Sequence, residues 1–419
     1  MYRKNTVSMI AILLVLFSSL SHADVVERRK DQFGRDFGYY FYPIAGEIPG
    51  LGKATGFGAS LLNMAHGDTD FTGYYVRGDF KATGAALLDY HVLPQRLIFD
   101  VGYNDYMVAA TAYSRGINSD SADVIYPKVE GAYVLGQMTL TFDQRRYELF
   151  GRILSGRNRL LEVLDKNSLA FPGVDKAWKY NTSYSLGGSL DFTDDRIDPR
   201  KGVRLEVSSR LPSDQQADYS EYFVNDYNLT TYLPMQKWDT LVFNLFYSHA
   251  LVTRKGLADD ILLRQRYGLG CASGDAACAA AEDKLINGLL ANNRYGTASA
   301  LGGTQRLRAY DNGRYFAGQA LFYGVEYRWN LTDERTPFNI LVARGVRTGI
   351  QLAVFAERGM VSDNFSGLFK DGRNSYGVGA RLVLSGVIIR FDLAAGSEGP
   401  QSQLFITYPW SMFSVDNPG

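Results

Sequence analysis

Apolar and polar residues alternate with a period of two along most of the chain. Residues 97–104 are an example, and their apolar positions are Leu97, Phe99, Val101 and Tyr103. Similar alternation recurs in the segments 184–192, 203–208, 241–248 and 387–393. Such a pattern predicts strands with one face against apolar surroundings and the other face polar. Charged residues recur on the polar face, for example Arg390 and Asp392.

Two architectures satisfy this alternation: a soluble sandwich and a membrane barrel whose polar face lines the lumen. The 28 Tyr, 24 Phe and 43 Gly, with only 12 Pro, suit many strands with aromatic ends, as barrel girdles require. No linker divides the chain after residue 24, although a single soluble core rarely grows this large. The sequence therefore predicts an all-β fold, a transmembrane antiparallel β-barrel. About fourteen strands are clear, and two more fit within residues 37–64.

The turn signals alternate between short and long. Short turns are expected near residues 94–95, 198–202 and 236–239, and long loops near 65–80, 155–178, 212–220, 254–317 and 360–374. Outer-membrane barrels have short periplasmic turns and longer external loops. The pattern places the protein in the bacterial cell outer membrane, in contact with outer-membrane lipid.

The first 23 residues are typical of a secretory signal. Arg3 and Lys4 precede an apolar run at 7–17, and residues 21–23 offer a small-residue cleavage site. An uncleaved anchor is the alternative. Residues 24–51 are interpreted as a short periplasmic lead-in that can include a first strand near 37–46. The barrel is expected over 52–413, with a polar tail at 414–419.

The long loop before residue 302 contains both cysteines of the chain, Cys271 and Cys278. An exported protein permits disulfides, so we expect these two to be bridged. A metal site is not expected, because two ligands do not make a closed site, and no cofactor is indicated. Residues 276–290 have a helical, alanine-rich pattern, with a disordered loop as the alternative.

Composition argues against two classes of function. The formal net charge is zero, which gives no basis for binding nucleic acid. After the signal, the histidines are His66, His91 and His249, and none has a neighbouring serine or aspartate signature. Hydrolytic barrels need a base beside a nucleophile or an acid, so no enzyme activity is predicted.

Residues 302–310, Gly-Gly-Thr-Gln-Arg-Leu-Arg-Ala-Tyr, contain the arginine of greatest interest, Arg308. Two alternating strands follow, one with Glu326 on its polar face and one reading Phe-Ala-Glu-Arg-Gly at 355–359. A guanidinium group enclosed in a lumen needs a carboxylate partner. The pattern suggests a loop folded into a polar-lined barrel.

These residues, with the Pro/Gly turn at 191–202, resemble the BamA/TamA-type outer-membrane protein superfamily, the bacterial surface antigen family, in a short form lacking periplasmic domains. The resemblance covers about residues 52–410 and is strongest after 184. It implies sixteen strands and a lumen loop locked against a strand. The lock residues it implies are Arg308, Glu357 as first partner, Glu326 as second, Tyr310, Phe355 and Gly359.

The sequence departs from the family pattern at two of these positions. Ala309 stands where the family has glycine, and Glu357 where it has aspartate. Glycine tolerates positive φ and alanine does not, so Ala309 puts the geometry of the loop tip in question. The pairing itself either pins the loop or stabilises a conformation needed for substrate passage.

The resemblance implies insertion or translocation of proteins at the outer membrane. Periplasmic domains usually bind the unfolded clients by strand addition, so a separate periplasmic partner would supply that role here. The alternatives are a solute-conducting pore and a surface-interaction barrel; a plugged lumen favours assembly or surface roles, and an open charged lumen favours the pore. Pro409 after Tyr408 suggests either a labile seam or a strand that simply ends there.

Overall fold

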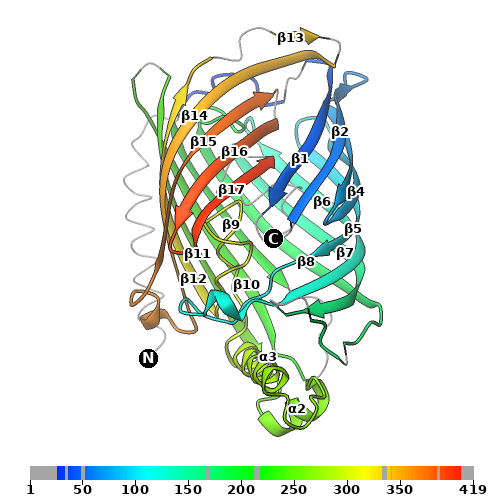
Figure 1. Cartoon of the computed structure of the whole chain (residues 1–419). Coiled ribbons are helices and arrows are strands. Elements are labelled where there is room, and N and C mark those ends of the chain that lie inside the picture. Colours follow the sequence, from blue (N-terminus) through cyan, green and yellow to red (C-terminus); the bar gives the residue numbers. More distant parts are fainter. Residues whose placement is uncertain are drawn as a thin grey trace.

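The computed structural model describes residues 26–33, 36–48, 52–165, 169–172, 174–211, 218–236, 238–332, 337–340, 342–384 and 387–406. Within these residues seventeen strands form one antiparallel sheet that curls into a barrel (Figure 1). The strands are β1 (Gly38–Ile48), β2 (Gly52–Met64), β3 (Thr69–Gly78), β4 (Lys81–Leu93), β5 (Leu97–Ala109), β6 (Tyr126–Phe142), β7 (Tyr147–Leu164), β8 (Lys179–Thr193), β9 (Gly202–Leu211), β10 (Glu221–Pro234), β11 (Thr240–Arg254), β12 (Gln319–Asn330), β13 (Pro337–Ile340), β14 (Ala343–Ser362), β15 (Arg373–Leu384), β16 (Val387–Gly396) and β17 (Gly399–Ile406). Because β13 has only four residues, the wall consists of the other sixteen strands, as the resemblance implied.

Each wall strand pairs with its neighbour in sequence, and β12 pairs with β14 beyond the short β13. The ring is joined through β14, whose residues 343–347 extend past the start of its ladder with β15 at Thr348. There Tyr39 and Tyr40 of β1 pair with Arg344 and Ala343. The body of β1 lies beside β17, although no ladder joins the two strands in the part of the chain described. The expectations for Tyr408 and Pro409 lie outside that part.

The two faces of the wall differ as the alternation predicted. On β11, Phe243 and Leu245 face outward and are 43% and 47% exposed, whereas Asn244 faces inward and is 3% exposed. On β16, Arg390 and Asp392 are buried inside. A belt of exposed apolar side chains around a polar interior is the arrangement of a barrel in lipid. Among the described residues, neither helix has the length and apolar character that a membrane crossing requires.

Most of the short turns lie at one end of the barrel and the longest loops at the other, although the two-residue turns at 79–80 and 397–398 lie at the long-loop end. The short connections include residues 65–68, 94–96, 143–146 and 194–201, and the long ones include 110–125 and 255–318. This distribution is the one that outer-membrane barrels show between their periplasmic and external ends. The long loop at 110–125 was not anticipated from the sequence.

Two of the expected long loops were misplaced. The loop near 65–80 is wrong, because a four-residue turn is followed at once by β3. The polar residues that suggested a loop face the lumen: Asp70 is 7% exposed, and the Thr72 hydroxyl is 3.0 Å from that of Ser60. The loop at 155–178 was placed too early, because β7 continues to Leu164.

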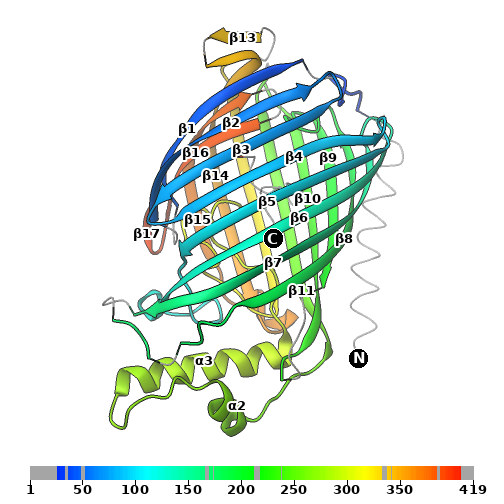
Figure 2. The ribbon, with the colours of Figure 1, turned by 90° about the vertical axis from the view of Figure 1, so that its right-hand side faces the viewer.

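Two helices form an arm outside the long-loop end (Figure 2). They are α2 (Asp260–Tyr267) and α3 (Ala276–Tyr295), so the helix expected at 276–290 is present. Asp275 caps α3 by accepting a hydrogen bond from the Cys278 N–H at 3.0 Å. The expected disulfide joins Cys271, in the connection between α2 and α3, to Cys278 in the first turn of α3.

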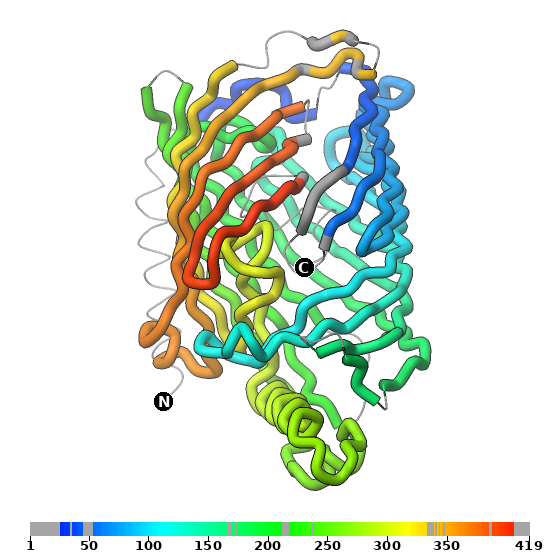
Figure 3. Tube along the Cα trace, in the orientation of Figure 1, coloured from blue at the N-terminus to red at the C-terminus, as the bar shows by residue number. Residues whose placement is uncertain are grey.

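Residues inside the ring come from two directions. The chain between α3 and β12, yellow in Figure 3, lies within the ring of strands. Residues 26–33, which belong to the expected lead-in, lie at the short-turn end, where the Gln32 N–H donates to Gln144 Oε1 at 3.0 Å. The first strand expected near 37–46 is β1. The expected signal at 1–23 and tail at 414–419 lie outside the described residues.

Candidate functional site in the barrel lumen

The loop at 302–310 enters the lumen as a tight hairpin. Leu301 and Tyr315 form a β-bridge at its base. Gly302 and Gly303 have φ of +111° and +95°, and a Cβ on Gly302 would lie 2.2 Å from the carbonyl oxygen of Asp311. Only glycine adopts this backbone without strain. The two glycines therefore fix the direction in which the loop enters the barrel.

Arg308 lies at the loop tip and is completely buried. Its Nε donates to Glu357 Oε1 at 2.8 Å and its backbone N–H donates to Glu357 Oε2 at 2.9 Å. Its Nη1 donates to Glu326 Oε2 at 3.0 Å and to Asp392 Oδ2 at 2.9 Å. One guanidinium group thus joins carboxylates from β14, β12 and β16. Charge-assisted bonds of this kind are stronger and more directional than neutral ones.

Further arginines of the wall share two of these carboxylates. Glu326 accepts from Arg328 Nε at 2.8 Å and from Arg381 Nη2 at 2.7 Å. Asp392 lies 3.4 Å from Arg390 Nε. All five side chains are at most 2% exposed. The carboxylates are thus surrounded by guanidinium groups, and the cluster is held by mutual pairing.

The loop is also attached to the wall through its backbone and Tyr310. These bonds run from Ala309 N to Ser375 Oγ at 3.1 Å, from Gln403 Nε2 to the Arg308 carbonyl at 2.5 Å, from Tyr310 Oη to the Asn374 carbonyl at 3.0 Å, and from Arg390 Nη2 to the Thr304 carbonyl. They reach β15, β16 and β17, so the contacts of the loop with the wall extend over the neighbouring strands from β12 to β17.

A cation–π interaction and an apolar contact also hold the loop tip against the wall. The Arg308 guanidinium lies 3.3 Å from the ring centroid of Phe355, close enough for a cation–π interaction. Gly359 leaves room for Leu307, because a Cβ there would lie 2.5 Å from Leu307 Cδ1. The structure therefore brings all six predicted residues, Arg308, Glu357, Glu326, Tyr310, Phe355 and Gly359, to one place.

The sequence did not identify every member of the cluster. Asp392, Arg381 and Arg390 were not predicted, although alternation had placed Arg390 and Asp392 on a polar face. The concern over Ala309 does not apply, because the non-glycine residue with positive φ at the tip is Leu307, at +54°. Leucine in this region is uncommon, and its side chain is completely buried here.

A second set of contacts closes the long-loop side of this hairpin. Arg314 Nη2 donates to Glu398 Oε1 at 2.8 Å and to the Ser119 carbonyl at 2.7 Å. The Tyr113 hydroxyl donates to Asp311. Burial raises the pKa of Tyr113, and the bond to Asp311 adds to the rise, so this hydroxyl remains a donor. Loop 110–125 thus lies over the chain that follows the lumen loop and forms hydrogen bonds with it.

The histidines have surroundings typical of packing. His249 stacks on Tyr247 with ring centroids 5.6 Å apart, and His91 Nδ1 is 3.6 Å from Asp68. His66 is in the turn between β2 and β3. Within the described residues, His, Cys, Asp and Glu side chains form no group of three or more suited to a metal ion.

No family model and no curated protein matches the sequence. Among solved structures, the barrel is similar to BamA from Haemophilus ducreyi lacking POTRA domains 1–3, with 11% identity over 88% of this chain and 69% of that chain and a TM-score of 0.45. It is similar to CdiB from Escherichia coli (10% identity, 88% of this chain, 61% of that chain, TM-score 0.49). CdiB from Acinetobacter baumannii gives 10% identity, 88% and 59% coverage and a TM-score of 0.47. The chain thus spans about three fifths of each CdiB chain, and at such values the likeness concerns the fold alone.

Proposed function

We propose that this chain is a bacterial outer-membrane barrel that assists the insertion or translocation of proteins. The observation that supports this most is the lumen loop, whose Arg308 is bonded to carboxylates of three separate strands. A pore for free diffusion has no need of a fixed loop across its centre. A barrel that admits a polypeptide needs to be sealed whenever no client is present.

The membrane position follows from the outer surface. Apolar side chains such as Leu149, Leu186 and Phe57 are 62%, 69% and 63% exposed, and lipid is the solvent in which such exposure is stable. Outer-membrane lipid is therefore the first partner of the barrel. The short-turn end, with residues 26–33, would face the periplasm, and the α2–α3 arm would face outward.

Clients in this proposal are unfolded polypeptides that arrive from the periplasm. Recognition of such clients commonly uses strand addition to a domain. Residues 26–33 of this chain are instead seated against the short turns of the barrel. We therefore assign client recognition to a separate periplasmic partner.

A surface-interaction role is the second candidate. The helical arm supports it, because α2 and α3 project beyond the wall and are braced by a disulfide and by Arg264, which pairs with Asp283 at 2.7 Å. A solute pore is the third reading and requires the loop to leave the lumen. The three candidates predict different behaviour in a reconstituted membrane.

Single-channel conductance of the refolded barrel in a planar bilayer is the first test. We expect a nearly silent wild type and a conducting Arg308→Ala variant, because removal of the guanidinium releases the loop. Arg152→Ala is the matched control, since Arg152 lies on β7 and donates to Gln137 at 2.9 Å, away from the loop. A large steady conductance that is indifferent to Arg308 would identify a pore and exclude the proposal.

A second measurement separates assembly from a surface role. Liposomes with and without the protein would be given an unfolded outer-membrane polypeptide, and its acquisition of protease resistance would be followed. Faster insertion in the presence of the barrel supports the proposal. A silent barrel that leaves insertion unchanged, with or without a periplasmic extract, would favour the surface-interaction role.

A further inference from the structure

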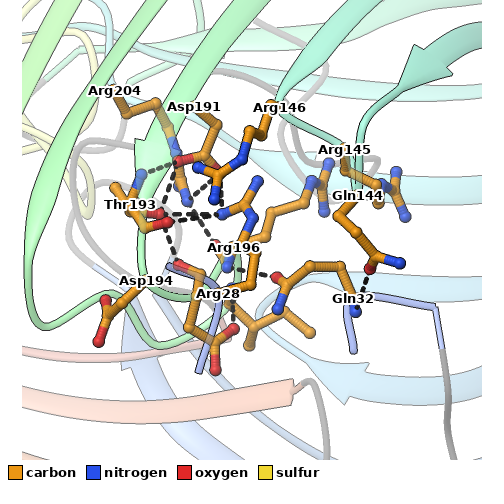
Figure 4. A network of polar contacts seen from close by, with 12 residues as sticks. Arg28, Gln32, Gln144, Arg145, Arg146, Asp191, Thr193, Asp194, Arg196 and Arg204 are labelled. Carbon is orange, nitrogen blue, oxygen red and sulfur yellow. Dashed lines mark hydrogen bonds and ion pairs between the residues drawn. The ribbon is translucent and has the colours of Figure 1, made fainter. Parts of the chain in front are cut away.

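A group of arginines at the short-turn end surrounds a single aspartate, Asp191 on β8 (Figure 4). Arg28 of the lead-in lies with Nη1 3.4 Å from Asp191 Oδ2, and Arg204 of β9 donates to the same oxygen at 2.9 Å. Arg146, from the turn between β6 and β7, donates to the carbonyl of Val26 at 2.6 Å. Two pieces of wall and the lead-in therefore meet here.

Positive charge exceeds negative charge in this group. The second oxygen of Asp191 accepts from Thr193 Oγ1 at 2.6 Å. The nearby carboxylate of Glu148 is engaged by Arg145 and Arg196, at 2.7 and 3.3 Å. The carboxylate of Asp143 is 3.6 Å from Arg146 and 63% exposed, so its effect is weakened by water.

Acids on the β8–β9 turn are occupied as well. Asp195 lies 3.1 Å from Arg29 and 2.9 Å from Lys30. Asp198 lies 3.0 Å from Arg200. These contacts engage other cations at this end of the barrel. Asp191 pairs with Arg28 and Arg204, Arg146 lies close enough to act on Arg28, and the buried Glu206 of β9 also acts on Arg204. Two buried carboxylates, Asp191 and Glu206, therefore lie among three guanidinium groups.

Several N–H groups of these arginines point at no acceptor. In the described part of the chain, Arg28 Nε and Nη2, Arg146 Nη1 and Arg204 Nε are buried without a hydrogen-bond partner. The side chains of Arg28 and Arg146 are only 7% and 8% exposed. Burial lowers the pKa of Arg28, and the nearby Arg146 and Arg204 lower it further against the pull of Asp191. Unpaired buried donors on charged groups are costly.

We propose that Arg28, Arg146 and Arg204 form a binding site for a small oxyanion of the phosphate or sulfate type. Guanidinium forks match the oxygens of such an anion and supply several charge-assisted bonds at once. The anion would balance the excess charge and accept from the N–H groups that lack acceptors. This assignment goes beyond protein assembly and does not depend on it.

The site is divided between the lead-in and the wall of the barrel. Arg28 belongs to the lead-in, whereas Arg146 and Arg204 belong to the barrel. A complete site exists only while residues 26–33 are seated. An oxyanion would therefore stabilise the seated lead-in by mass action, and the ratio of seated to released lead-in would be multiplied by one plus the anion concentration over its dissociation constant.

Limited proteolysis of the full chain in detergent micelles tests this coupling. Trypsin cleaves after arginine and lysine, and the lead-in offers Arg28, Arg29 and Lys30. We expect inorganic phosphate to slow cleavage there on the order of tenfold at ten times its dissociation constant. Sodium chloride at equal ionic strength is the reference, because chloride screens charge but cannot bridge the forks. Calorimetric titration of the wild type with phosphate should show binding.

Two variants decide between the site and general electrostatics. In Arg146→Gln, cleavage of the lead-in should be as fast with phosphate as with chloride, whatever the basal cleavage rate of the variant. Arg204→Gln takes its place if Arg146→Gln does not fold. Arg200→Gln is the matched control, because it removes a cation of the short-turn end that is not one of the three arginines. Phosphate should still slow cleavage of this variant relative to chloride. No calorimetric binding by the wild type, or equal protection by phosphate in Arg146→Gln, would overturn the proposal.

Discussion

The lumen is entered by chain at two places that use the same chemistry under different conditions. At the centre, Arg308 is 0% exposed and its carboxylate partners lie at 2.8–3.0 Å. At the short-turn mouth, Arg29 and Lys30 are 32% and 42% exposed and pair with Asp195 at 3.1 and 2.9 Å. Water and salt screen the mouth pairs but do not reach the central ones. Similar ion pairs therefore give a fixed element in one place and a displaceable one in the other.

The two places also differ in what they hold together. Arg308 links β12, β14 and β16, so a change in the spacing of these strands alters its bonds. The lead-in cations Arg29 and Lys30 contact acids of a single turn, between β8 and β9. Loop 302–310 is thus sensitive to the shape of the wall, whereas the ion pairs of Arg29 and Lys30 depend on that one turn.

The largest effect is expected for Arg308→Ala. The change leaves Glu326, Glu357 and Asp392 buried with one cation fewer among them. Removing one partner of a buried ionic cluster typically costs about 3–5 kcal/mol. We expect a loss of that order in the free energy of unfolding, measured by urea titration in micelles, and the loss should persist when salt is added.

Conservative substitutions check the cause of that loss. Arg308→Lys keeps the charge but cannot form the fork, so it should recover only part of the stability. Asp392→Asn keeps the shape and removes one carboxylate from a cluster with several arginines, so its cost should be smaller than that of Arg308→Ala. An Arg308→Ala loss of less than 1 kcal/mol, the range typical of exposed pairs, would remove the contrast between the two places.

Much of the central site could be predicted from the sequence because its signals are local. Period two placed Glu326 and Arg328 on the inner face, and the family resemblance added Arg308 and Glu357. Asp392 could not be chosen, because it is 84 positions from Arg308 and its proximity depends on the register of β16. Register comes from pairing between strands, which one sequence does not reveal.

The mouth was much harder to foresee. Arg28 and Thr193 are 165 positions apart, and the charged start of the lead-in was read only as a polar segment. The same difficulty misplaced the loop at 65–80, where polar residues of β3 face the lumen rather than solvent. The sequence alone does not distinguish a polar residue that faces the lumen from a polar residue in a loop, because the difference depends on how the strands close into a barrel.

A small, salt-dependent effect is expected for Arg29→Ala. Its pairs with Asp195 and Asp198 are partly exposed, and exposed pairs contribute about 0.2–1 kcal/mol. Tryptic cleavage after Arg28 and Lys30, the sites that remain in the variant, should therefore accelerate by a small factor at low salt. The difference from wild type at these two sites should disappear near 1 M salt, where the Debye length is about 3 Å. Equal acceleration at all salt concentrations would show that Arg29 holds the lead-in through contacts other than these ion pairs.

The smallest effect on the lumen is expected from the disulfide between Cys271 and Cys278. It closes a loop with a sequence separation of seven at the start of α3, and a bridge over so short a loop contributes about 2–3 kcal/mol to whatever unit contains it. That unit is the α2–α3 arm, because the arm lies outside the wall. Replacement of both cysteines by serine should increase hydrogen exchange in α3 and leave the conductance and the urea midpoint of the barrel unchanged. If conductance rises instead, the arm takes part in sealing the lumen together with the loop that Arg308 holds.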